Sequence, residues 1–235
     1  MNRLLGRIAG TVVVLGALTA TPAHAVLVDF TNSAAWGGAD GTTSYTSATT
    51  YGGVAVTVST NVPGYRISFN TAIGGDPPQP ACGQTGLACQ GDGLGINDND
   101  ETGLLPDQIH VHFSAPVTLT GVRFLDLFGN TAGDNPAEVA LWAYQATLAD
   151  GTKIDGSATG TDTSTLGYLA VGVTPLTITD ITFFAREPES PFNTDFALAA
   201  VDMSPVPEPG TLVLLGSGLL TLGMPVVRRL RKARG

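Results

Sequence analysis

The stretch Ile109-His110-Val111-His112-Phe113 alternates apolar and polar side chains, and the segment Val117–Leu127 alternates in the same way. Successive side chains of a β-strand point to opposite faces of the sheet, so this alternation predicts strands with one buried and one wet face. The two histidines share the wet face, opposite the apolar side chains between them. Gly121 interrupts the second segment and predicts a β-bulge.

The chain on both sides of this stretch has the composition of strands and turns. It is rich in Thr, Val, Gly, Asp and Ala, and no helical periodicity is sustained. Further strands are predicted at Val26–Phe30, Val54–Val58, Tyr65–Phe69, Glu138–Leu148, Leu166–Val173, Leu176–Ala185 and Phe196–Val201. Asp150-Gly151 predicts a hairpin turn, and Thr152–Ile154 begins the return strand. We therefore expect residues 26–203 to form one all-β domain, an antiparallel β-sandwich of jelly-roll type, followed by a short spacer at Met203-Ser204-Pro205.

Residues 1–25 have the three parts of a cleavable signal peptide. Arg3 and Arg7 form a positive region, an apolar core runs from Ile8 to Leu18, and Ala23-His24-Ala25 follows the helix-breaking Pro22. The small residues Ala23 and Ala25 suit a signal peptidase, so the mature chain should begin near Val26. The apolar core is too short for a comfortable membrane span.

The C-terminal end joins Val206-Pro207-Glu208-Pro209-Gly210-Thr211 to an apolar run and a basic tail at residues 228–235. No side chain from Thr211 to Val227 is charged, and this length is at the short end of the roughly 17–25 residues that cross a bilayer as a helix. Glycine is tolerated in lipid, and basic residues beyond the run follow the positive-inside rule. The sequence therefore predicts a transmembrane helix over 211–227. A plain tail anchor and a buried core helix are the alternatives.

In this order the three parts resemble the PEP-CTERM sorting signal of Gram-negative bacteria. The resemblance covers residues 204–235, with the motif at 206–211. It implies that Pro207, Glu208 and Pro209 are recognised by an exosortase, a membrane-embedded protease. It also implies transient anchoring in the inner membrane and release to the cell envelope or extracellular matrix. The bodies of many such proteins are similar all-β sandwiches. Proline disfavours helix at the residue before it, so the motif should stay extended and accessible.

Without its leader and basic tail, the exported portion is strongly acidic. Only Arg66, Arg123, Lys153 and Arg186 remain of the eleven basic residues, against all twenty acidic ones, so the net charge is four minus twenty, or −16. This charge excludes nucleic acid as a partner, repels anionic lipid and attracts cations. The plainer explanation of the same composition is that a soluble secreted protein keeps a charged surface.

Residues 70–107 form the longest stretch without a strand pattern, and they contain both cysteines. A loop of this length in a compact domain is usually functional or disordered. Cys82 and Cys89 are separated by six residues in an exported chain, which favours a disulfide worth about 2–3 kcal/mol. The alternative, a metal or redox pair, lacks CxxC spacing and further ligands.

The same loop holds an acidic cluster of hard oxygen ligands. Asp92, Asn97, Asp98, Asp100 and Glu101 are candidate ligands of a structural Ca²⁺, although their spacing is not that of an EF-hand. Acidic turns also occur simply because they are well solvated. Beyond this ion, we expect no required cofactor.

The sequence has no motif for a catalytic centre. Nucleophile elbow, Walker loop, dinucleotide fingerprint and HExxH are all missing. His110 and His112 would bind a metal only with a third ligand from elsewhere, and two polar side chains on a wet face are the plainer interpretation. Trp142 and Tyr144 share a strand face and can stack on sugars, but strand aromatics more often belong to the core.

Two functions remain open. The first is an exported, exosortase-processed surface or matrix protein whose non-catalytic β-sandwich has extracellular polysaccharide as its candidate ligand. The alternative is a secreted enzyme that acts on polysaccharide through carboxylates of the acidic loop or through a metal held by His110 and His112.

Overall fold

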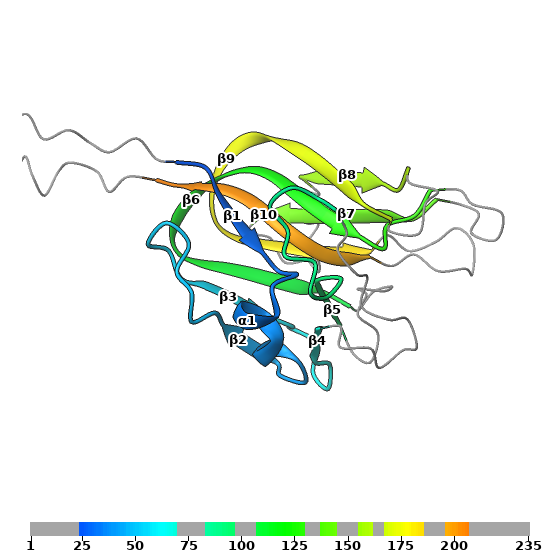
Figure 1. Cartoon of the computed structure of the whole chain (residues 1–235), viewed down its shortest axis with the longest axis horizontal. Coiled ribbons are helices and arrows are strands. Elements are labelled where there is room, and N and C mark those ends of the chain that lie inside the picture. Colours follow the sequence, from blue (N-terminus) through cyan, green and yellow to red (C-terminus); the bar gives the residue numbers. More distant parts are fainter. Residues whose placement is uncertain are drawn as a thin grey trace, which may run out of the picture.

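The computed structural model describes residues 24–69, 83–96, 107–129, 137–144, 155–161, 167–185 and 196–206. These residues form ten strands, one short α-helix and one 3-10 helix (Figure 1). The elements are β1 Val26–Asp29, α1 Ser33–Trp36, η1 Gly37–Ala39, β2 Ser44–Thr46, β3 Val56–Ser59, β4 Ile67–Phe69, β5 Leu94–Ile96, β6 Ile109–Leu125, β7 Val139–Tyr144, β8 Gly156–Thr159, β9 Leu169–Ala185 and β10 Ala197–Pro205. The paired strands are antiparallel, so the predicted all-β class is confirmed.

Two long strands, β6 and β9, form the spine of the sheet. The two strands pair with each other along most of their length. The strand order across the sheet is β4-β5-β10-β6-β9-β7-β8. On its other side, the first part of β6 pairs with β3 and the second part with β10. Both strands bend where β6 changes neighbours, so the sheet curls over itself (Figure 1). The finer prediction of a jelly-roll sandwich remains a prediction, because the strands belong to a single curled sheet.

The bends coincide with prolines. The register between β6 and β9 shifts between His112 and Val117, and again between Leu119 and Gly121. Pro116 lies in the first irregularity on β6, and Pro175 lies opposite the second on β9. Proline has no N–H to donate to a ladder and is therefore found at bulges or edges. The predicted bulge at Gly121 is confirmed.

Aromatic side chains fill the space inside the curl. Phe124 of β6 packs against Trp142 of β7, Phe183 of β9 and Phe196, with ring centroids 6.0, 6.1 and 5.2 Å away. A second group is centred on Trp36, whose indole N–H donates to the Tyr51 hydroxyl at 3.1 Å. Both tryptophans are almost fully buried. The prediction that strand aromatics belong to the core therefore holds for Trp142.

Three predicted features differ from the structure. The segments 109–113 and 117–127 are one strand, as are 166–173 and 176–185. The last strand does not stop at Val201, because β10 continues to Pro205; the prediction of a spacer at Met203-Ser204-Pro205 is wrong. Within the supposed loop 70–107, Leu94–Ile96 forms the buried strand β5, which pairs with β4 and β10. The predicted hairpin turn at 150–151 lies outside the described residues.

Candidate functional site

The junction between body and C-terminal segment is tightly held. Pro205 at the end of β10 pairs with Val117, and the Val206 N–H donates to the Pro116 carbonyl at 3.1 Å. On the other side of β10, Met203 pairs with Val26. A Cβ on Gly52 would lie 2.7 Å from Pro205 Cγ, so the 51–54 turn packs closely on the junction. The last strand therefore ends at Pro205, and hydrogen bonding to the body continues through Val206.

The sorting and cleavage residues are only partly within the described chain. Pro207, Glu208, Pro209 and Ala23 lie outside the described residues, whereas Ala25 is exposed beside the start of β1. Within the parts of the chain that the structure describes, no helix is long and apolar enough to cross a membrane. The predicted transmembrane segment 211–227 is not among those parts, so it stays a prediction.

The loop around Cys89 is fastened to the end of β1 by polar contacts. Asp29 accepts hydrogen bonds from the Thr31 hydroxyl at 2.6 Å and from the Ala88 N–H at 2.7 Å. The Cys89 N–H donates to Thr31 Oγ1 at 2.8 Å. Cys82 lies outside the described residues, so the Cys82–Cys89 disulfide remains a prediction.

The proposed calcium ligands are divided between described and undescribed residues. Asp92 is buried just before β5, while Asn97, Asp98, Asp100 and Glu101 lie outside the described residues. Among the residues that are described, no group of three His, Cys, Asp or Glu side chains is arranged to hold a metal. The calcium site stays a prediction. Millimolar Ca²⁺ should raise the melting temperature if the site exists, and an unchanged melt contradicts it.

The two histidines meet a carboxylate on the outer face of the sheet. His110 Nε2 lies 3.1 Å and His112 Nδ1 lies 2.7 Å from the same oxygen of Asp180, on the neighbouring strand β9. A carboxylate only accepts hydrogen bonds, so both of these ring nitrogens donate to it. Burial raises the pKa of Asp180, but hydrogen bonds from Thr179 and His112 and the nearby imidazoles outweigh it, so the pKa lies below its ordinary value.

A hydroxyl completes this cluster. Thr182 Oγ1 lies 3.2 Å from His110 Nδ1, so hydroxyl, imidazole and carboxylate follow one another as in nucleophilic catalysis. Thr182 is only 9% exposed, however, which leaves its oxygen poorly accessible to a substrate. The arrangement is better explained as a surface hydrogen-bond network. Alternation along β9 could have placed Asp180 and Thr182 on one face, but not the register that brings them to the histidines.

A second polar site was missed by the sequence analysis. Arg123 of β6 donates from Nε and Nη2 to the two carboxylate oxygens of Asp202 in β10, at 2.9 and 2.8 Å. Its Nη1 also donates to the Thr85 carbonyl at 2.9 Å. Hydrogen bonding to Asp202 raises the pKa of Arg123. Through these hydrogen bonds, Arg123 links β10 to β6 at the centre of the sheet and to the loop that carries Cys89.

The outer face around the histidines is polar across four strands. The register sets Thr46, Thr57, His112 and Asp180 in one row and Ser44, Ser59, His110 and Thr182 in the next. Residues opposite one another in a sheet share a face. Burial alternates as expected, since Ile109, Val111 and Phe113 are inside while the half-exposed His112 is outside. The predicted sidedness of this strand is confirmed.

Comparison with known proteins identifies the C-terminal segment. A sequence-family model of the PEP-CTERM protein-sorting motif matches residues 205–232. No curated protein and no solved structure matches the chain. The motif implies a protein that an exosortase processes and that is exported to the cell envelope or outside. It covers only the end of the chain, so the body is not assigned to a family.

Proposed function

We propose that this exosortase substrate delivers a non-catalytic β-sandwich body to the cell surface or extracellular matrix, where the body binds polysaccharide. In this scheme signal peptidase removes residues 1–25, and the segment 211–227 anchors the chain transiently in the inner membrane. The exosortase then recognises Pro207, Glu208 and Pro209. β10 ends at Pro205 and Val206 still bonds to the Pro116 carbonyl, which supports a motif presented directly beside the folded body.

The polar outer face over β2, β3, β6 and β9 supports the binding role. Apart from the buried Thr182, its two rows present hydroxyls, imidazoles and a carboxylate, which together donate and accept the hydrogen bonds that sugar hydroxyls form. Neighbouring strands lie about 4.8 Å apart, so four strands span about 14 Å, enough for several sugar units. The net charge of −16 disfavours an anionic polymer, so we expect a neutral polysaccharide.

Binding of the exported protein to neutral and anionic polysaccharides, measured by titration calorimetry, tests this function. His112→Ala and Thr57→Val should each weaken binding to the neutral polymer by roughly fivefold, because each removes hydrogen bonds worth about 1 kcal/mol. Ser157→Ala is the matched control, since this exposed residue lies on β8 outside the two rows. Equal affinities for all three variants, or no binding by the unaltered protein, contradict the proposal.

The alternative is a secreted enzyme that acts on polysaccharide. Assays for release of reducing ends from the same polysaccharides distinguish it from the non-catalytic body. Release of reducing ends that is lost in Asp100→Asn and Glu101→Gln favours catalysis by the acidic loop. Release that is lost in His110→Ala and restored by added metal favours a metal at the histidines. Binding without turnover favours the non-catalytic body.

A further inference from the structure

We propose that, while the chain is anchored, one end of the body rests on the outer surface of the lipid bilayer. This is the end where β1 begins and β10 ends. The inference rests on the membrane anchoring in the proposed function, and it adds the orientation of the body and the surface that contacts lipid.

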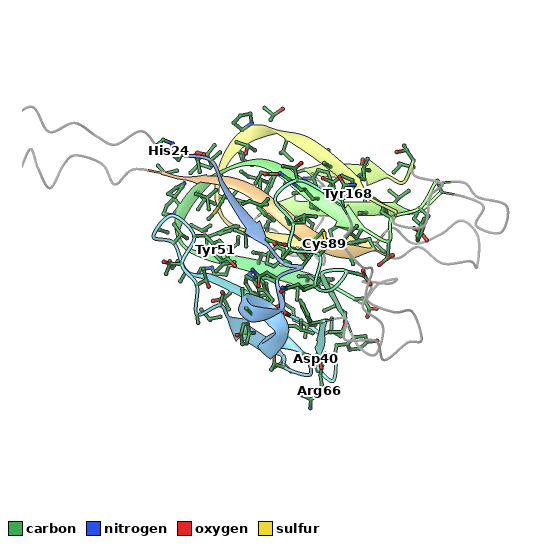
Figure 2. All side chains as sticks on the ribbon, in the orientation of Figure 1. His24, Asp40, Tyr51, Arg66, Cys89 and Tyr168 are labelled. Atoms are coloured by element: carbon green, nitrogen blue, oxygen red, sulfur yellow. The ribbon has the colours of Figure 1, made fainter. Side chains whose placement is uncertain are left out.

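The first strand of the body begins where its last strand ends. Val26, at the start of β1, pairs with Met203 of β10. Figure 1 shows β1 and β10 side by side, with these ends beside the bends of β6 and β9. Figure 2 shows His24 at this end, whereas Asp40 and Arg66 lie together on another side of the molecule. A signal peptide before Val26 and an anchor after Thr211 can therefore occupy one membrane together.

Five segments surround this place, and we call them the exit end: residues 26–28, 47–55, 114–118, 174–177 and 203–206. Their contacts are direct. The Gly52 position faces Val26 and Pro205, Ala55 and Ser114 exchange hydrogen bonds, and Thr177 pairs with Thr118. Together with the Val206–Pro116 bond, these contacts make the exit end one continuous surface.

The exit end carries no Asp, Glu, Lys or Arg, although the exported portion has a net charge of −16. It also holds both large hydrophobic side chains that are exposed among the described residues, Leu176 at 39% and Val206 at 36%. An acidic surface is repelled by anionic lipid headgroups, whereas an uncharged surface with apolar side chains is not. The exit end therefore combines exposed apolar side chains with the absence of charged residues, which suits contact with a bilayer.

A short linker limits how far the exit end can lie from the membrane. Only residues 207–210 separate Val206 from the apolar run that begins at Thr211. Five Cα–Cα steps join Val206 to Thr211, and fully extended they reach at most about 18 Å. Val206 must therefore stay within this distance of the start of the apolar run until the chain is cut, which keeps the exit end close to the membrane surface.

Tryptophan quenching in vesicles tests the orientation. The full chain is reconstituted into vesicles of phosphatidylethanolamine and phosphatidylglycerol that include a lipid with a nitroxide on its headgroup. Leu176→Trp places a fluorophore on the exit end, and Arg66→Trp places one on the side marked in Figure 2. The native Trp36 and Trp142 are buried, so their emission is subtracted with the unaltered chain. We expect the added emission to be lost in the first variant and retained in the second.

Each other outcome has a distinct meaning. Equal quenching of both variants, or quenching of neither, overturns the orientation even when processing proceeds normally. The orientation is also overturned if the Leu176→Trp emission changes only after the exosortase is added, because the exit end then faces the enzyme rather than lipid. Failure of the chain to float with the vesicles contradicts the anchoring itself, which is a failure of the proposed function.

Discussion

Asp180 shows how one residue can organise a surface. Its carboxylate accepts from two imidazoles on the adjacent strand, and one of them also meets the Thr182 hydroxyl. The two nitrogens contact the same oxygen at hydrogen-bond distance, which suits shared donation to a carboxylate. At this scale the sequence predicted that His110 and His112 face outward, but their partner is seventy residues away in the chain and depends on strand register.

The depressed pKa of Asp180 makes a prediction about pH. A carboxyl group whose folded pKa is lowered adds stability above its unfolded pKa, and that stability is lost as the pH falls through the folded value. Asp180→Asn should therefore cost about 1 kcal/mol of unfolding free energy at pH 7, because the group is partly solvated. The difference should shrink as the pH falls below about 4. Urea melts measure it, and a difference independent of pH contradicts the assignment.

The side chains of Arg123 and Asp202, which form a bidentate ion pair, should contribute to stability in a coupled way. Bidentate geometry strengthens such a pair, but both side chains are partly exposed, at 20% and 31%, so we expect a coupling of only about 1 kcal/mol. A double-mutant cycle with Arg123→Met and Asp202→Asn measures it. Arg66→Met is the control, because Arg66 is exposed and donates to the Gly41 carbonyl; it should change stability by less than about 0.5 kcal/mol. Strict additivity in the cycle would refute the coupling.

At the scale of elements, Gly156 allows β7 and β8 to pair with the Trp142 ring packed over the glycine. A Cβ on Gly156 would overlap the ring of Trp142, which lies opposite it in the ladder. Gly156→Ala should therefore displace a core tryptophan and cost roughly 1–3 kcal/mol. Gly172→Ala in β9 is the matched control, since its Cβ would meet nothing within 4 Å. Thermal melts of the two variants should differ clearly, and equal stability would show that the ring moves without cost.

Alternation located most strands, because it reports which face is buried. It could not show that Pro116 and Pro175 sit at bends within continuous strands, since a proline in a sequence also predicts a strand end. It also missed β5, whose three residues Leu94–Ile96 are too few for a pattern of alternation. Burial of β5 depends on its partners β4 and β10, which are distant in sequence.

At the scale of the whole molecule, the two ends of the chain were the most informative part of the sequence. The sorting motif has a fixed order of turn, apolar run and basic tail, which needs no tertiary structure to be recognised, and the family comparison agrees with it. The ligand of the body depends instead on a face assembled from four strands, which pairing alone creates. The structure adds that the start of β1 and the end of β10 lie side by side, at an end of the sheet whose segments carry no charged side chain.

Intact mass of the exported protein, from cells with and without their exosortase, tests the central claim most directly. With the enzyme, the chain should begin at Val26, lack the apolar run and the arginine tail, and be about 2 Da lighter than its reduced form if Cys82 and Cys89 are bonded. Without the enzyme, the same tail should remain attached. A chain that keeps its tail in the presence of the exosortase, or loses it equally in its absence, contradicts the account.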